Sequence, residues 1–103
     1  MWEKRFRVGQ IIHHRKFGYR GVIIGIDEEF SGTEDWYERV ARSCPPKDRP
    51  WYKVLVNQSD QETYVAERHL EPDEDCHPIV HPLVSLYFDE INDGTYVTNR
   101  VWN

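Results

Sequence analysis

The chain has 103 residues, of which 39% are hydrophobic and 30% are charged, and its formal net charge is −5. This length fits one domain, and four Trp, six Tyr and four Phe supply a core that disordered chains lack. No run of about 18 apolar residues and no apolar segment after the basic N-terminus exists, so we expect a soluble, intracellular protein without a membrane span or signal peptide.

Two β-hairpins are predicted from β-branched and aromatic segments. The first joins residues 6–14 to residues 21–27 across a glycine-containing turn, and it places Val22, Ile24 and Ile26 on one face. The second joins residues 51–56, the clearest strand of the sequence, to residues 62–66 across the turn residues 57–60. The sequence therefore predicts a mainly β fold.

A long insertion, residues 28–50, separates the two hairpins. Ser31 and Glu34 fit a capping box at the start of a short helix. Trp36 with Val40, and Tyr37 with Ala41, have the i,i+4 spacing of one helix side. Three prolines, at positions 45, 46 and 50, prevent the helix from continuing. Long connections of this kind are often functional.

The segments after the second hairpin predict a loop and then a helix. Residues 67–75 are acidic and contain a proline, which indicates a loop. From Pro82 an apolar stripe has helical spacing, and Gly94 fits the position after the helix. The residues of this stripe are Leu83, Leu86, Tyr87 and Ile91. We expect a C-terminal helix and an extended tail within residues 77–103.

The basic residues are concentrated at the N-terminus. Residues 1–20 carry six basic and one acidic side chains, whereas residues 21–103 carry seven basic and seventeen acidic ones. Duplex DNA is bound mainly by neutralising its phosphates, which needs a broad basic face. The charge distribution favours a protein partner over nucleic acid.

No catalytic constellation is present, so we expect no enzyme, no cofactor and no metal. Cys76, His77 and His81 resemble part of a zinc site, but prolines interrupt the segment and the distant Cys44 would have to complete it. A single bridge between the two cysteines stays open at this point. His13 and His14 are adjacent on a strand and face opposite sides, so one of them is expected to be buried, or to lie in an interface, with a hydrogen-bond partner.

The aromatic residues form either a core or a binding surface. In a domain of this size most of them are expected in the core. The others are either scattered over the surface or form a patch for binding a peptide, with Phe17 and Tyr19 at a turn and Trp51, Tyr52 and Tyr64 on strands.

Several separated motifs, taken in order, resemble the YccV-like or HspQ-type domain, also called the hemimethylated DNA-binding domain. They span residues 6–72 and lie at Phe6, Val8–Gln10, Ile12, His14–Ile23, Gly25, Asp27, Pro50–Tyr52, Val54–Val56, Thr63–Glu67 and Leu70. The resemblance implies a small SH3-like β-barrel over residues 6–72, with a helical insertion at residues 28–50.

The C-terminal stretch is similar to the tails of eukaryotic members such as the plastid adaptor ClpF and an F-box-only protein. It comprises His81–Val84, Tyr87, Phe88, Gly94, Tyr96, Val97 and Asn99. The resemblance implies that residues 1–103 form one domain of a larger intracellular protein. The plastid stroma or another organelle is compatible with it, but the sequence does not identify the compartment. The resemblance further implies hemimethylated DNA binding, or service as an adaptor or specificity factor for a Clp- or Lon-type protease.

We expect the adaptor class, with a protein partner that is a protease-system component or its substrate, and no membrane. The candidate protein-binding residues are Trp36, Tyr37, His14, Tyr19 and Trp51. The alternative is DNA binding, which would be weak and salt-sensitive, through Arg5, Arg7, Arg15, Lys16 and Arg20.

Overall fold

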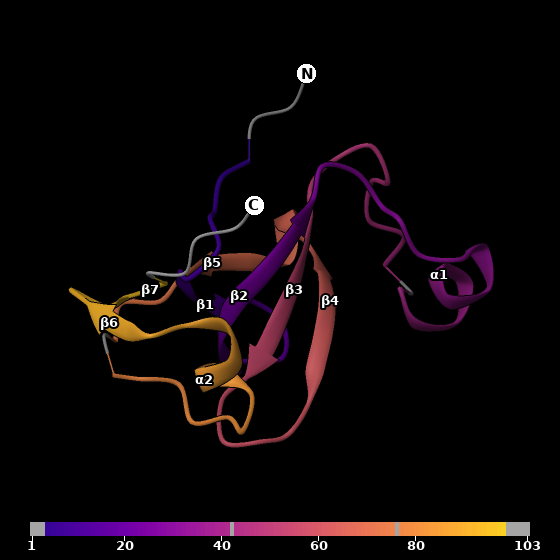
Figure 1. Ribbon diagram of the computed structural model, residues 1–103. Helices are drawn as coiled ribbons and strands as arrows, with labels where there is room; N and C mark the ends of the chain where they lie inside the picture. The colour runs from indigo at the N-terminus through magenta and orange to yellow at the C-terminus, as the bar shows by residue number, and fades with distance from the viewer. Residues whose placement is uncertain (1–3, 42, 76, 99–103) are drawn as a thin grey trace, which may run out of the picture.

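The computed structural model describes residues 4–41, 43–75 and 77–98, and it contains two antiparallel sheets (Figure 1). The larger sheet has the strand order β4-β3-β2-β1-β5, and β6 and β7 form a separate hairpin. The strands are β1 (Ile11–His14), β2 (Arg20–Asp27), β3 (Trp51–Val56), β4 (Glu62–Ala66), β5 (Leu70–Pro72), β6 (Glu90–Asn92) and β7 (Thr95–Val97). The helices are α1 (Glu34–Val40), the 3-10 helix η1 (Glu67–His69) and α2 (Val84–Tyr87).

Both predicted hairpins are confirmed, as β1–β2 and β3–β4, within a mainly β fold. A register shift between Ile23 and Gly25 interrupts the pairing of β2 with β3, and such irregularities bend and twist a strand. The last strand of the larger sheet, β5, returns to pair with β1. The sheet is not closed, because β4 and β5 are its two unpaired edges. Barrel closure therefore stays a prediction.

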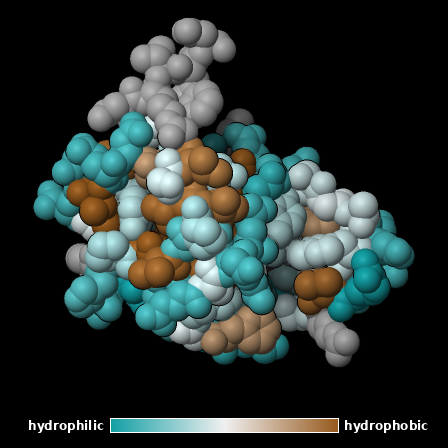
Figure 2. Space-filling view, turned by 60° about the horizontal axis from the view of Figure 1, so that its bottom comes forward, coloured by the Kyte–Doolittle hydropathy of each residue, from teal (hydrophilic) through white to brown (hydrophobic). Residues whose placement is uncertain are grey.

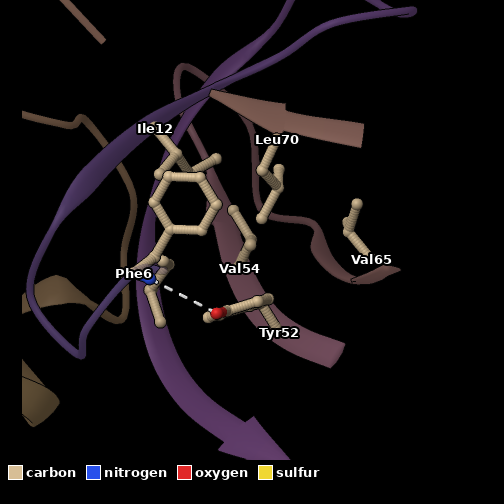
Figure 3. Packing of buried hydrophobic residues seen from close by; sticks show 7 residues of the cluster. Phe6, Ile12, Tyr52, Val54, Val65 and Leu70 are labelled. Carbon is tan, nitrogen blue, oxygen red and sulfur yellow. Dashed lines mark hydrogen bonds between the residues drawn. The ribbon is translucent and has the colours of Figure 1, made fainter. Parts of the chain in front are cut away.

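The alternation of side chains along the strands gives the sheet two apolar faces. One core contains Phe6, Ile12, Ile23, Tyr52, Val54, Val65 and Leu70 (Figure 3). Within it, the Tyr52 hydroxyl accepts the N–H of Phe6 at 3.3 Å and donates to the Glu67 carboxylate at 2.6 Å. The second core joins Ile11, Val22 and Leu55 of the sheet to C-terminal residues, which are Ile79, Phe88 and Tyr96. The C-terminal segment therefore covers the opposite face of the sheet.

The insertion lies between β2 and β3 as predicted, and its helix α1 projects from the sheet (Figure 1). The predicted cap is wrong by two residues. Thr33 caps the helix, because its hydroxyl accepts the N–H of Trp36 at 3.1 Å. Ser31 instead donates its hydroxyl to Asp27 at 2.8 Å. Ser31 thus ties the insertion to the end of β2.

The predicted C-terminal helix is wrong in its length. The helix α2 has only four residues, and the chain then forms the β6–β7 hairpin. Asp93 and Gly94 both have positive φ (50° and 76°), which is the conformation of a two-residue hairpin turn. Gly94 therefore turns a hairpin and does not end a helix. The predicted extended tail is confirmed as β7.

The segment 67–75 was expected to be a loop, and this prediction is also wrong for its first half. Residues 67–69 form η1 and residues 70–72 form β5. Glu67 is buried, since its carboxylate accepts the Tyr52 hydroxyl and the backbone N–H of Arg5. Within the described ranges, no helix is long and apolar enough to cross a bilayer.

Candidate functional site

A groove of about 620 Å³ lies where the insertion meets the sheet. Its walls come from the β1–β2 turn, α1, η1 and the whole of β4, and we call it the aromatic groove. Its aromatic and histidine lining includes His14, Phe17, Tyr19, Trp36, Trp51 and His69. Figure 2 shows the insertion as a lobe at the right of the molecule, with hydrophobic residues exposed on this lobe and on the body.

A cluster of rings holds the insertion beside the groove. The rings of Phe30 and Trp51 have centroids 4.9 Å apart, and Trp51 and Tyr64 are 5.2 Å apart. Trp36 contacts the same cluster, with its centroid 5.8 Å from that of Tyr64. The Tyr64 hydroxyl donates to Asp27 at 2.7 Å, and this hydrogen bond lowers the pKa of the Asp27 carboxyl. Aromatic packing therefore holds α1 against β4, and Asp27, which accepts from both Tyr64 and Ser31, joins the start of the insertion to β4.

His14 forms the buried wall of the groove. Its Nδ1 accepts the backbone N–H of Lys16 at 3.1 Å and of Phe17 at 3.0 Å. The ring stacks on Phe17 at 4.7 Å and on His69 at 5.6 Å. Burial, followed by the nearby His69, His13 and Lys16, lowers the pKa of His14 to about 4. His14 is therefore neutral at physiological pH.

The low pKa of His14 predicts that the protein loses stability in mild acid. Between the ordinary histidine pKa of 6.5 and about 4, the unfolded chain binds a proton that the folded chain excludes. The free energy of unfolding should therefore fall as pH falls through this window, and half-buried His69, whose pKa is also lowered, adds the same sign. Thermal melts at pH 7.5 and pH 5 should show a smaller loss for His14→Gln, whose amide oxygen can still accept both N–H groups. An equal loss in both proteins would contradict this.

The structure brings four of the five predicted protein-binding residues together, because His14, Tyr19, Trp36 and Trp51 all line the groove. Their role in binding stays a prediction. Trp51 is 2% exposed and its indole N–H donates to the Pro46 carbonyl at 3.1 Å, so it is mainly a core residue. Tyr37 is not among the groove residues. Its hydroxyl donates to the carbonyl of Pro45, and it lines a separate hollow.

Sequence reasoning did not assign Val40, Thr63 or His69 to the groove. Thr63 could have been found, because it is two residues from buried Val65 on a strand, and Tyr19 contacts it through a hydroxyl pair at 2.8 Å. His69 could not, since its position depends on η1, which has no capping side chain in the sequence. The alternation of residues along β4 therefore predicts part of the groove lining, whereas nothing in the sequence of η1 predicts that His69 belongs to it.

The five predicted DNA-binding residues have different environments. Arg5 and Arg7 line a hollow near the N-terminus, and Arg15 and Lys16 are exposed in the β1–β2 turn. Arg20 is engaged, because its guanidinium donates to Asp73 at 2.8 Å and to two backbone carbonyls. Phosphate binding by Arg20 would have to replace these partners.

The histidines follow the sequence expectation. His14 is the buried one, and His13 pairs with Glu71 at 2.9 Å. His81 is also buried, with its Nδ1 accepting the N–H of Leu83 and its Nε2 lying 3.0 Å from the Gln61 carbonyl. In the part of the chain that the structure describes, no three His, Cys, Asp or Glu side chains form a metal-binding group. Cys76 lies outside the described residues, and so does a Cys44–Cys76 bridge.

One comparison with known proteins bears on this site. A family model described as "Hemimethylated DNA-binding protein YccV like" matches residues 4–95. The match includes every strand of the larger sheet, the insertion and all the groove residues named above.

Proposed function

We propose that this chain, which belongs to the YccV-like family of hemimethylated DNA-binding proteins, is a non-enzymatic protein-interaction module. It docks a protein partner in the aromatic groove, as adaptor or specificity factor for an ATP-dependent protease of the Clp or Lon type. We further propose that the larger sheet is an SH3-like barrel that is not closed. The return of β5 to pair with β1 supports this.

The convergence of residues from four separate parts of the chain on one groove supports the docking function. His14, Tyr19 and Trp36, which sequence reasoning assigned to binding, line it together with the exposed Phe17. Protein interfaces concentrate binding energy in aromatic residues that fill such pockets. The formal net charge of −5 also favours a protein over a polyanion.

The second candidate is binding of hemimethylated DNA, which the family description favours. Basic residues around η1 support it. The backbone N–H of Arg5 donates to Glu67, and that of Arg15 donates to the carbonyl of His69. These contacts place both residues beside Arg68. Arg7 and Lys16 would add further phosphate contacts, whereas Arg20 is paired with Asp73.

The docking function predicts that Trp36→Ala weakens binding to purified Clp or Lon components by about thirtyfold, which corresponds to about 2 kcal/mol. Phe17→Ala should also weaken binding, and with only a small loss of stability, because Phe17 is 71% exposed and loses mainly its stacking on His14. Leu86→Ala is the matched control, since Leu86 is 60% exposed and is absent from the groove lining. Calorimetric titration gives the affinities, and thermal melts give the folded fraction.

The same proteins are then titrated with hemimethylated and unmethylated duplexes at physiological salt. Tight and selective binding of the hemimethylated duplex, together with no protease-component binding, would replace the adaptor function by the DNA function. If the binding of Trp36→Ala falls only in proportion to its folded fraction, Trp36 is structural. The result with Phe17→Ala then decides whether the groove binds the partner.

A further inference from the structure

The strand β4 presents unpaired backbone groups along the aromatic groove. It is an edge of the larger sheet, and residues 62–66 all line the groove. The N–H of Val56 donates to the Gln61 carbonyl, and the N–H of Glu67 donates to the Pro50 carbonyl. These bonds fix the alternation of the ladder, so the N–H and C=O of Glu62 and Tyr64 point away from β3.

Glu62 and Tyr64 have no backbone partner on that side within residues 4–41, 43–75 and 77–98. An edge of this kind is a template for another strand, and proteins use it to bind extended peptides. Side chains of the added strand would alternate, so every second one would point toward the rings of the groove.

One end of the groove is basic. Lys16 lines it. The positive charges of Arg68, Lys16 and Arg15 all lie near His69 and help to lower the pKa of its ring. Within the described part of the chain, none of these three cations forms an ion pair. In a chain of net charge −5 such a set is unusual, and it complements an acidic side chain of a ligand.

His14 adds a directed donor at the same end. Both backbone N–H groups that it accepts point to Nδ1, so the proton of the neutral ring lies on Nε2. No described residue accepts a hydrogen bond from this N–H. Because no buried side-chain nitrogen or oxygen of the described residues lacks a hydrogen-bond partner, this N–H must reach the solvent of the groove that His14 lines, where a ligand oxygen can replace water as its acceptor.

We propose that the groove binds an extended segment of the partner protein as an additional strand on β4. The segment carries an aromatic or large apolar side chain directed into the groove, and next to it an acidic residue directed to Arg15, Lys16 and Arg68. This inference rests on the docking function proposed above and specifies its ligand.

A peptide fits this site better than a nucleic acid. The free N–H and C=O groups of Glu62 and Tyr64 match the spacing of a peptide backbone. The carboxylate of Glu62, at the other end of β4, would oppose a phosphate chain running along the strand. The groove therefore selects a peptide that has an acidic residue near η1 and none near Glu62.

A selection of random octapeptides displayed on phage tests the inference with the purified protein. Enriched peptides should contain an aromatic or large apolar residue within two positions of Asp or Glu. The most enriched peptide, synthesised, should slow amide hydrogen exchange at Tyr64 in the wild-type protein, because strand addition engages this N–H. Replacing its acidic residue by Lys should reduce the affinity about fivefold or more.

The variant Glu62→Pro removes one outward N–H, and proline is tolerated at an edge strand on this side. It should lower the peptide affinity about three- to tenfold, the loss expected for one hydrogen bond. The matched control is Glu62→Thr, which loses the same carboxylate but keeps the N–H, so the three- to tenfold difference is measured between these two variants and reports the N–H alone. If Glu62→Pro does not fold, the exchange measurement at Tyr64 on the wild-type protein carries the test.

The inference is overturned if no peptide is enriched, if enriched peptides are basic, if they bind without protecting Tyr64, or if a hemimethylated duplex occupies the groove instead. These results leave the docking function standing where a Clp or Lon component still binds in a Phe17-dependent manner. If enriched peptides protect Tyr64 but no such component binds, strand addition holds and the protease-adaptor function is wrong.

Discussion

Replacing Trp51 by alanine is expected to lower the free energy of unfolding by about 3–5 kcal/mol, the usual cost of truncating a buried aromatic residue. Trp51 is 2% exposed and its ring contacts Phe30 and Tyr64. Its indole N–H also holds the carbonyl of Pro46, which would lose a partner. Urea denaturation followed by far-ultraviolet circular dichroism measures the change without relying on tryptophan fluorescence.

Trp36→Ala is the matched control, because Trp36 belongs to the same ring cluster but is only half-buried. The free energy of unfolding should fall clearly less in this variant, by about 1–2 kcal/mol, because the Trp36 side chain buries less apolar surface on folding than that of Trp51. Similar losses for the two variants would mean that the insertion and the sheet form one cooperative core. Trp51 would then have no special role in the fold.

Replacing Gly9 by alanine should cost about 2–5 kcal/mol, combining backbone strain with a steric overlap. Gly9 has φ 93°, and an added Cβ would lie 2.1 Å from the carbonyl oxygen of Tyr96. At this position the Gly9 N–H donates to Ile23 and its carbonyl accepts from Tyr96, both at 2.8 Å. The β6–β7 hairpin must therefore move away from the sheet, exposing Phe88 and Tyr96.

Gly18→Ala separates the two causes. Gly18 has φ 77°, but apart from its two chain neighbours no atom of the described residues lies within 4 Å of its added Cβ. This variant should lose only about 1–2 kcal/mol from strain in the left-handed region. Denaturation gives the two stabilities, and amide exchange at Tyr96 should accelerate in Gly9→Ala alone. Equal stabilities would show that the hairpin adapts to the extra methyl group.

Strand alternation and turn residues were sufficient to predict the two hairpins and the insertion. The apolar and β-branched residues of β2, β3 and β4 report directly which backbone conformation buries them. The predictions failed where two structures fit one pattern. The spacing of Leu83, Leu86, Tyr87 and Ile91 is helical, yet Asp93 and Gly94 form a hairpin turn with positive φ. Pairing of β6 with β7 and packing of Phe88 and Tyr96 on the sheet then favour the hairpin.

The candidate site follows the same division. The sequence by itself determined that the chain has a mainly β fold, an aromatic-rich insertion and an N-terminal concentration of basic residues, because these depend on residue type and local period. Only the tertiary structure brought His14, Trp36 and His69 to one groove and separated Tyr37 from it. It also buried Glu67 against Tyr52 and left β4 as a free edge. These outcomes depend on contacts between residues distant in the chain, for which no local pattern carries a signal.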